Sequence, residues 1–504
     1  MSRSDRPNLV FIFSDQQSKD MVGAYGVGSV QTPRLDALAA DGITFANCIS
    51  SSPVCTPYRG MLITGQHPMR NNCFTNDRRL ATDLGDSFAE VLAKAGYRSG
   101  YVGKWHLYGG SRYRPVPPGP DRHGFDATFL TNNCDVNYHP DHAFYWGDDN
   151  EVHRFGTWEV EGQTDQALAF LDGQTADQPF SLFVSYHPPH NHLGGDEDRY
   201  SGFDAPEEFK ARYDPDKIEL RPSLPDNQRT RRMMQGYLAM CSEVDHHVGR
   251  IIDRLEEQGL LDNTIVVYTS DHGETFGGYL AHWHKSTPED VSIAVPLIIK
   301  LPGRELAGVR RDLLVGTLDL MPTILGLMGI RAPEACQGAD LSAAIRDGDD
   351  DAVESVPLFY FPTPWRGVVT RRWTYAIEHI DRTPAAIEAI GSDVGRTRLL
   401  RTYDVLYDHL EDPHQLRNLF GQTDIQGFSG IEAVQRELHE LTMAWLDYFD
   451  DPFPTQTELD ALIGDAPEAP VELLHDLTPW RGNPDGETIH HGPGDSSGRI
   501  RPDR

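Results

Sequence analysis

The sequence lacks any apolar run long enough to cross a membrane. About 18 or more consecutive apolar residues are needed to span a bilayer, and no stretch of this chain approaches that length. The segment from Met1 to Arg6 is polar and leads directly into an expected strand, so it has no apolar centre of a secretory signal peptide. We therefore expect a cytoplasmic protein without membrane partners, although a chain from which a signal peptide had been removed would look the same.

Cysteine is scarce, and the few cysteines are scattered. The chain has no Cys-x-x-Cys pair and no internal repeat. This spacing excludes the disulfide frame of a small secreted domain and the usual zinc-binding patterns. We expect reduced thiols. The six cysteines are Cys48, Cys55, Cys73, Cys134, Cys241 and Cys336.

Positive charge is also in short supply. The 504 residues include 45 Lys and Arg against 76 Asp and Glu, which gives a formal net charge of −31. Proteins that bind nucleic acid need a basic surface, so that class of partner is excluded. An anionic substrate would have to bind at a local positive site within a negative field. The composition leaves the oligomeric state open, and a homo-oligomer is possible.

Continuous apolar runs are typical of strands buried on both faces of a parallel sheet. One such run, LVFIF, ends just before Asp15 and Gln16, and another, TIVVYT, ends just before Asp271 and His272. In open α/β sheets ligands collect at the carboxyl ends of the strands. These pairs can therefore supply ligands to a hard cation. For each pair taken alone, a simple polar exit from strand into loop is the alternative.

The pattern of elements predicts an α/β fold with a large mixed, mostly parallel sheet flanked by helices in residues 1–355. An amphipathic pattern over residues 229–261 predicts a long helix packed on this sheet, with Cys241 on its buried face. Short patterned segments then replace the long apolar runs and indicate a smaller second domain, residues 356–462. Residues 463–504 are rich in Pro, Gly, His and Asp, and we expect an extended tail.

The segment Cys55-Thr56-Pro57-Tyr58-Arg59 places a cysteine two positions before a proline and four before an arginine. Proline suits the first turn of a helix, so Cys55 should stand at a helix N-terminus, where free N–H groups and the helix dipole favour an anion. Arg59 would add a positive charge one turn further on. A small buried thiol before an ordinary helix is the alternative.

A second polar segment, Gly-Lys-Trp-His, contains Lys104 and His106. If it forms a strand, both side chains point to the same side, where a cation and an imidazole suit an anionic substrate and proton transfer. Residues 108–160 show no clear period, and a loop region of this length usually binds something. The side chains that we expect to contact a polar, ring-shaped ligand are Arg112, Arg114, Trp146 and, outside this region, Trp365.

The Cys-x-Pro-x-Arg motif, followed by Thr64-Gly65, and the Gly-Lys-Trp-His motif resemble two signature segments of the formylglycine-dependent sulfatases. These enzymes belong to the alkaline-phosphatase-like superfamily. The resemblance covers roughly residues 7–420. It implies the mixed sheet of that superfamily and a small C-terminal antiparallel α+β domain. It also implies that a separate formylglycine-generating enzyme oxidises Cys55 to formylglycine.

The resemblance further implies one divalent cation, which we expect to be Ca²⁺ because the ligand set is rich in oxygen, with Mg²⁺ or Mn²⁺ possible. Residue 55 would contribute to this metal site. The other implied metal ligands are Asp15, Gln16, Asp271 and His272.

The resemblance also assigns the catalytic groups. Lys104, Arg59 and Lys285 would neutralise the sulfuryl oxygens. His190, alone or with Lys285, would protonate the departing oxygen of the alcohol. His106 would then take a proton from the second hydroxyl of hydrated formylglycine, so that sulfate leaves by C–O cleavage. The implied catalytic set is Cys55, Arg59, Lys104, His106, His190 and Lys285.

Gln16 is the main departure from the family pattern, because many sulfatases have a second Asp there. The combination of Asp-Gln with Asp-His resembles phosphonate monoester hydrolases of the same superfamily, so a phosphonate or phosphate diester hydrolase is one alternative. A catalytically silent carbohydrate-binding relative is another, which the complete set of catalytic positions disfavours. The loops and the negative field favour a small, sparsely sulfated sugar, cleaved at a chain end, over a long polysulfated polymer.

Overall fold

The structure is a computed structural model. It describes residues 6–26, 28–135, 138–175, 178–191, 202–281, 285–380, 402–422, 430–455 and 458. The predicted tail, residues 463–504, lies outside the described residues. Among the described residues, no helix combines the length and the apolar character that crossing a membrane requires.

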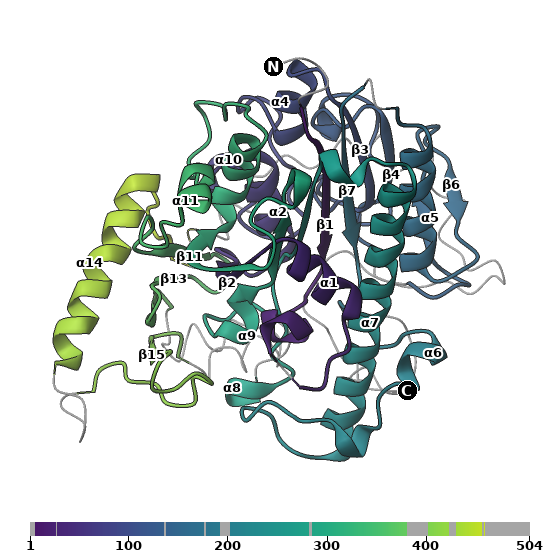
Figure 1. The fold of residues 1–504 in the computed structure, drawn as a ribbon. Helices are drawn as coiled ribbons and strands as arrows, with labels where there is room; N and C mark the ends of the chain where they lie inside the picture. Colours follow the sequence, from purple (N-terminus) through teal and green to yellow (C-terminus); the bar gives the residue numbers. More distant parts are fainter. Residues whose placement is uncertain are drawn as a thin grey trace.

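A large sheet forms the centre of the molecule (Figure 1). Its strands are β1 (Asn8–Ser14), β2 (Ile43–Ile49), β3 (Arg98–Lys104), β4 (Thr128–Asn132), β5 (Phe144–Trp146), β6 (Val152–Arg154), β7 (Phe180–Tyr186), β8 (Thr264–Ser270), β9 (Ala294–Val295), β10 (Leu297–Lys300) and β11 (Val309–Gly316). The strand order is β11-β2-β10-β8-β1-β7-β3-β4-β5-β6, and β9 pairs with β2. The four adjacent strands β8, β1, β7 and β3 run parallel, whereas β10 is antiparallel to both of its neighbours. The predicted mixed, mostly parallel sheet is therefore confirmed.

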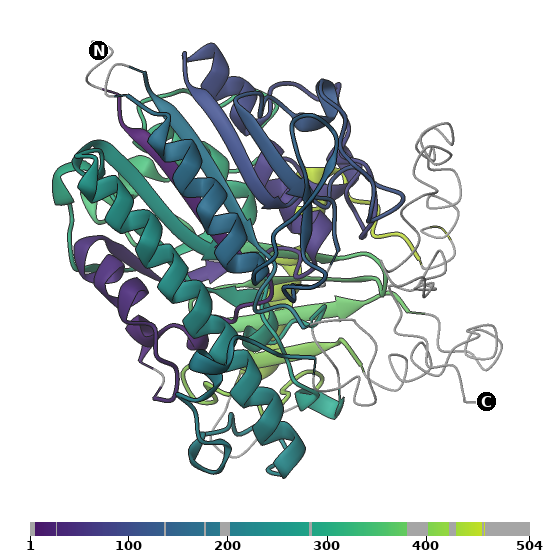
Figure 2. The same ribbon diagram turned by 90° about the vertical axis from the view of Figure 1, so that its right-hand side faces the viewer.

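Helices cover both faces of this sheet. The longer ones are α1 (Pro33–Asp41), α2 (Cys55–Thr64), α4 (Phe88–Lys94), α5 (Glu159–Asp172), α7 (Gln228–Glu257), α10 (Thr317–Leu327) and α11 (Ser342–Asp347), and the short ones are α3 (Pro68–Asn71), α6 (Glu207–Lys210), α8 (Gly278–Ala281) and α9 (Asp290–Ile293). Figure 2 shows α5 and α7 side by side across one face. The long helix that the amphipathic pattern predicted is α7, and Cys241 is fully buried on it.

The continuous apolar sequence of β1 is explained by these two layers. Val10 and Ile12 pack in the core that lies under α1, α5 and α7. Leu9, Phe11 and Phe13 point the other way, into the core under α2, α4 and α10. Because successive side chains of a strand alternate between the faces, a strand covered on both sides must be apolar throughout.

A second, smaller sheet follows in the chain. Its strands, β12 (Val356–Tyr360), β13 (Trp365–Val369), β14 (Trp373–Glu378) and β15 (Val405–Asp408), are antiparallel and pair in that order. Helix α14 (Ile431–Phe449) packs on β13 and β14. The predicted antiparallel α+β unit is therefore confirmed, whereas the domain boundaries at residues 355 and 462 stay predictions.

A buried ion pair joins the second sheet to the chain just after α14, and a histidine from the first part of the chain contacts it. Arg366 in β13 donates to both carboxylate oxygens of Asp451, at 2.6 and 3.1 Å. His67, between α2 and α3, lies 3.4 Å from the same carboxylate, and all three side chains are buried. Burial alone would raise the pKa of Asp451, but Arg366 and His67 outweigh it and hold this pKa well below the ordinary value of 3.8.

We expect Arg366→Ala to lower the free energy of unfolding by ~3–5 kcal/mol, because it leaves the Asp451 carboxylate buried without its partner. The loss should shrink as the pH falls below about 4, because a group with a depressed pKa contributes its stability only where the unfolded chain is ionised. Urea unfolding at several pH values measures both effects. The control is Arg371→Ala, whose exposed pair with Asp351 should contribute less than ~1 kcal/mol. Equal losses in the two variants would contradict this reading.

Candidate active site

The predicted site segments meet at one edge of the large sheet. Strands β1 and β8 end side by side, with Ser14 opposite Ser270, so the residues that follow each strand become neighbours. The chain after β7 carries His190, and β3 ends at Lys104. Helix α2 begins at Cys55, with extended Val54 before it and Pro57 in its first turn. The Thr56 N–H lies in the first turn and has no partner within the helix, so it donates to the side-chain oxygen of Asn76 instead.

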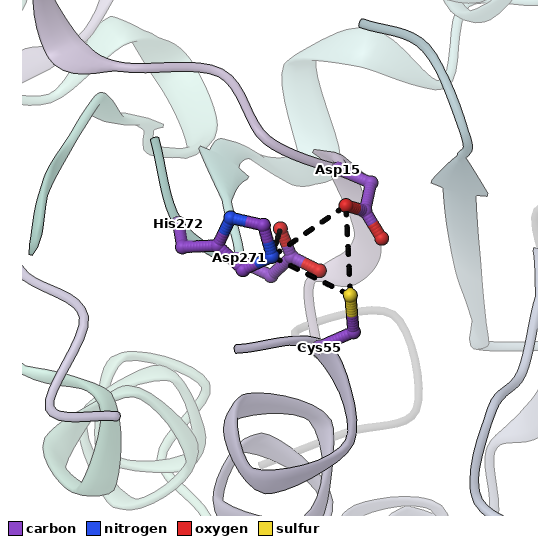
Figure 3. Close-up of side chains that lie close together, drawn as sticks. All are labelled: Asp15, Cys55, Asp271 and His272. Atoms are coloured by element: carbon purple, nitrogen blue, oxygen red, sulfur yellow. Dashed lines mark hydrogen bonds and ion pairs between the residues drawn. The ribbon is translucent and has the colours of Figure 1, made fainter. Parts of the chain in front are cut away.

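Two carboxylates, one imidazole and the Cys55 thiol form a compact buried cluster (Figure 3). The ligand atoms of Asp15, Cys55, Asp271 and His272 all lie within 4.8 Å of one another. The Cys55 Sγ is 3.4 Å from His272 Nε2 and 3.8 Å from Asp15 Oδ1. Burial and the nearby Asp15 charge raise the pKa of Asp271 to about 6. The cluster therefore concentrates negative charge away from water.

The donor set of this cluster fits a divalent cation. Nδ1 of His272 lies 3.1 Å from the Gly273 carbonyl oxygen, which can only accept, so the proton is on Nδ1. The lone pair of Nε2 then faces the two carboxylates, as in a metal-binding histidine oriented by its second nitrogen. Oxygen donors from carboxylates suit Ca²⁺, Mg²⁺ or Mn²⁺, and an imidazole is a common ligand of several transition metals. The arrangement does not select one ion.

Two buried cations neutralise part of this charge. Lys104 Nζ lies 2.5 Å from Asp15 Oδ2, and this contact outweighs burial and raises the pKa of Lys104. Arg59 Nη2 donates to Asp15 at 3.2 Å and to Asp271 at 3.3 Å, while its Nη1 donates to the Lys104 carbonyl and the Ser185 hydroxyl, both at 2.7 Å. The sequence pattern suggested that Arg59 faces the substrate. The structure corrects this, because protein oxygens occupy all four terminal N–H groups and Arg59 braces the carboxylates.

Lys285 is a further cation that contacts residue 55. Its Nζ lies 3.3 Å from Cys55 Sγ, 3.0 Å from Gln16 Oε1 and 2.9 Å from His190 Nε2. Because His190 Nδ1 lies 2.8 Å from the Asn191 carbonyl oxygen, the proton is on Nδ1 and Nε2 accepts from Lys285. Burial and the Lys285 charge lower the pKa of His190 well below its ordinary value.

The charges around Cys55 favour an anion at that position. Burial and the Asp15 carboxylate would each raise the pKa of the Cys55 thiol. Lys104 and Lys285 outweigh them and lower it well below its ordinary value. An oxygen nucleophile or a sulfuryl group bound at the same place would experience the same positive field.

Gln16 differs from a simple oxygen ligand. Its amide nitrogen donates to Glu274 at 2.5 Å and to Asn191 at 3.3 Å, and its oxygen accepts from Lys285. The oxygen is thereby directed to the side of residue 55, although Lys285 already uses it. The carboxylate that Gln16 lacks is supplied by its neighbour, because the Gln16 amide nitrogen donates to the fully buried side chain of Glu274.

His106 is reached by a route that the sequence pattern did not predict. Strand β3 ends at Lys104, and His106 follows in a loop with left-handed backbone (φ 57°). The prediction of two side chains on one strand face is therefore wrong, although the chain still brings both residues to the site. His106 Nε2 lies 2.9 Å from Asp77 Oδ1, and within the part of the chain that the structure describes its Nδ1 makes no hydrogen bond of ordinary geometry.

The four expected substrate contacts are mostly engaged within the protein. Arg112 donates to both oxygens of Asp77 at 2.8 Å. Arg114 is buried, lies over the Tyr108 ring and donates to backbone carbonyls. Trp146 is 7% exposed and donates to the Tyr113 carbonyl. Trp365 is 0% exposed and packs against the rings of Tyr360 and Tyr403.

This packing corrects the predictions for Arg114 and Trp365. Each is sealed in by apolar and backbone neighbours and has no surface left for a sugar. Long loops favoured them as ligand contacts, but large aromatic and guanidinium groups also fill cores when their polar atoms are satisfied. Arg112, with a side chain 22% exposed, and the edge of Trp146 stay possible contacts.

Sequence reasoning missed three groups of the site: Asp77, Cys134 and Glu274. Glu274 had a signal, because it completes the Ser-Asp-His-Gly-Glu exit of β8. Asp77 and Cys134 stand in no motif. Burial would raise the pKa of Cys134, but the charges of His106, Lys104 and Arg112 outweigh it and lower this pKa to about 7. Only the folded chain shows that both lie beside His106.

The family model for sulfatases matches residues 7–330. The chain is 33% identical to the ulvan-active sulfatase of Formosa agariphila over 86% of this chain and 80% of that protein. It is 28% identical to an endo-4-O-sulfatase of Bacteroides thetaiotaomicron, over 90% and 94% of the two chains.

Among solved structures, a protein described as the putative sulfatase yidJ from Bacteroides fragilis matches with a TM-score of 0.73 and 30% identity. The match covers 89% of this chain and 97% of that one. The family match therefore extends from the sequence to the fold, and over most of both chains. The residues that carry the sulfatase motifs lie together at one buried site. This chain belongs to the sulfatase family.

Proposed function

We propose that this chain hydrolyses a sulfate ester on a carbohydrate, with formylglycine at position 55 as nucleophile. The observation that carries the proposal is the position of Cys55 at a helix start, between a carboxylate–imidazole cluster and two lysines. The carboxylates suit a cation, and the lysines suit the oxygens of a sulfuryl group. A merely structural thiol would have no need of either.

The proposal assigns residues to the divalent cation and to formylglycine. Asp15, Asp271 and His272, with residue 55 and the Gln16 oxygen, would hold the cation, for which Ca²⁺ remains our first expectation. A bound cation would polarise the sulfuryl oxygens and lower the pKa of a hydroxyl at residue 55, and formylglycine would supply that hydroxyl as a hydrate. The four ligand atoms, which all lie within 4.8 Å of one another, suit one such cation with residue 55 beside it.

The other residues act by charge and proton transfer. Lys104 and Lys285 would stabilise negative charge on the sulfuryl oxygens. The Lys285–His190 pair would supply the proton for the departing alcohol oxygen, because Lys285 Nζ donates to His190 Nε2 at 2.9 Å. His106 would accept a proton from residue 55, because its Nε2 is tied to Asp77 and only Nδ1 is left as a base. Arg59 would act as a positioning residue that keeps Asp15 and Asp271 in place.

A carbohydrate substrate is supported by relatives whose names denote action on ulvan and on 4-O-sulfated material. The negative net charge of −31 favours a small, sparsely sulfated sugar over a polysulfated polymer. Cleavage at a chain end remains part of the proposal, although one relative is named as an endo enzyme. A formylglycine-generating enzyme is the partner that maturation would require.

The second candidate is a phosphonate or phosphate diester hydrolase, which Gln16 and His272 favour because they make the metal site less negative than two Asp pairs would. The test compares kcat/KM of fully matured protein on three substrate classes: monosulfated saccharides, an aryl phosphonate monoester and a phosphate diester. We expect the sulfate ester to be favoured by at least ~10-fold, a difference of about 1.4 kcal/mol in transition-state binding. Faster hydrolysis of the phosphonate would overturn the assignment.

A saccharide series of increasing length, at low and moderate salt, tests the substrate size. We expect kcat/KM to fall with the number of sulfate groups at low salt, and the fall to weaken when salt screens repulsion beyond ~8–10 Å. Equal rates for polymer and disaccharide at low salt would contradict a preference for small substrates.

A further inference from the structure

The Asp77 carboxylate, beside the site, contacts both the His106 imidazole and the Arg112 guanidinium. Asp77 Oδ1 lies 2.9 Å from His106 Nε2, and both Asp77 oxygens accept from Arg112 at 2.8 Å. We propose that Asp77, held by Arg112, is a positioning residue that fixes the proton-accepting nitrogen of His106 toward residue 55. This inference rests on the proposed function and assigns roles to two residues that no motif of the chain contains.

The tautomer of His106 follows from this contact. A carboxylate can only accept a hydrogen bond, so the ring proton lies on Nε2 whenever the imidazole is neutral. The lone pair is then on Nδ1, which makes no hydrogen bond of ordinary geometry to a described residue and belongs to a ring that interacts with Cys55 and Cys134. The transfer would move one proton from a hydroxyl of residue 55 to Nδ1, while the electron pair of that oxygen forms the aldehyde C=O bond and the C–O bond to the leaving sulfate breaks. The resulting positive charge sits beside the Asp77 carboxylate.

The backbone holds this pair against the start of α2. The hydroxyl of Thr56, the residue after Cys55, donates to the His106 carbonyl at 2.9 Å and accepts from the Asp77 N–H at 3.3 Å. One side chain therefore ties both partners to the nucleophile's own helix. Hence any shift of Asp77 would also shift the ring that faces residue 55.

Both members of the pair have left-handed backbone, with φ 64° for Asp77 and φ 57° for His106. Non-glycine residues reach this region at a cost of order 1–3 kcal/mol and keep it only where their surroundings impose it. Two such residues in direct contact are not needed to close the loops, because glycine would do so with less strain. The two strained residues are the two that make this side-chain contact.

The decisive measurement separates release of the alcohol from steady-state turnover. The proton transfer assigned to His106 comes after release of the alcohol, so Asp77→Asn should leave the first turnover intact. With a chromogenic aryl sulfate we expect a burst of one alcohol per matured site, at a rate within ~3-fold of wild type. The following steady-state rate should fall at least ~10-fold, up to the ~10²–10⁴-fold expected for loss of a positioned base.

A double-mutant cycle tests whether Asp77 acts through His106. In the His106→Ala background, Asp77→Asn should change the steady-state rate less than ~2-fold, because two residues that act as a unit are not additive. Additive losses would overturn the proposal. Should Asp77→Asn fail to fold, Arg112→Gln releases the clamp while keeping the carboxylate, and a burst followed by slowed turnover is again expected. A burst and a steady state lowered together would indicate structural damage and overturn the inference.

The matched control is Asp121→Asn. Asp121 also accepts from both arms of an arginine, Arg79, at 2.6 and 2.9 Å, but it does not contact His106. We expect its burst and steady-state rates to match wild type. Peptide mass analysis confirms formylglycine in every variant. Fully matured wild type that hydrolyses no sulfate ester would overturn the proposed function and this inference together, whereas an active wild type with an unaffected Asp77→Asn would overturn this inference alone.

Discussion

Cys55→Ala is expected to reduce turnover of a sulfate ester by at least ~10⁴-fold, because it removes the residue that we propose as the nucleophile. The fold should persist: residue 55 is a helix-start position, and alanine leaves Pro57 and the Thr56–Asn76 contact unchanged. Circular dichroism and urea unfolding check the fold, and initial rates check turnover.

The chemical state of residue 55 in wild-type protein tests maturation. Active wild-type protein should contain formylglycine at position 55, and protein made without the maturing enzyme should contain cysteine and be inactive. The control is Cys241→Ala, which removes an equally buried thiol from the core side of α7. That change should cost some stability and leave the rate per folded molecule unchanged. Active protein in which the peptide mass shows only unmodified cysteine would contradict the proposal that formylglycine is the nucleophile.

Removal of the cation is the second large effect that we expect. Asp271→Asn should lower the bound divalent ion from about one per chain to near zero and reduce turnover by ~10³-fold or more, the scale on which losing a polarising charge acts. The variant removes a charge that faces Asp15, His272 and residue 55 together. Elemental analysis measures the metal, and adding back Ca²⁺, Mg²⁺ or Mn²⁺ to chelated wild type identifies the ion.

A carboxylate outside the site provides the control for this prediction. Asp319 caps the start of α10 by accepting from the Gly316 N–H at 2.9 Å and from the Ala339 N–H at 2.8 Å. Burial raises its pKa to about 6, as for Asp271, but Asp319 belongs to no cluster of metal-binding side chains in the described part of the chain. Asp319→Asn should therefore keep its metal and its activity. Full activity in metal-free wild type would refute a role for the cation.

Much of the fold could be predicted from local patterns. The apolar run of β1 required burial on both faces, and the change of pattern near residue 355 marked the second sheet, which begins at Val356. The polar exits after β1 and β8 predicted that Asp15 and Asp271 meet, because parallel neighbours end at the same edge. Pro57 placed Cys55 at a helix start. Each of these inferences depends on residues close together in sequence.

The partners of individual side chains could not be predicted in this way. Arg59 was expected to face the substrate, yet its acceptors come from β3, β7 and the residues that follow β1 and β8. Arg112 was expected to contact a sugar, yet it holds Asp77, 35 residues away. Trp365 was expected to stack on a ligand, yet it fills the core of the second sheet. An arginine or a tryptophan looks the same in the sequence whether it contacts a substrate, holds a carboxylate or packs in a core.

The sequence by itself determined the family, the layers of the fold and most of the groups that meet at residue 55, because periodicity and motif order are local properties. Only the tertiary structure decided which atoms of those groups are free to act. The left-handed turn at His106 follows the end of β3, and the Thr56 hydroxyl binds the His106 carbonyl, so that Asp77 and not the sheet orients the imidazole. The physical reason is that hydrogen-bond acceptors and charges are assigned by distance in space, and the acceptors of Arg59 and His106 come from segments far apart along the chain.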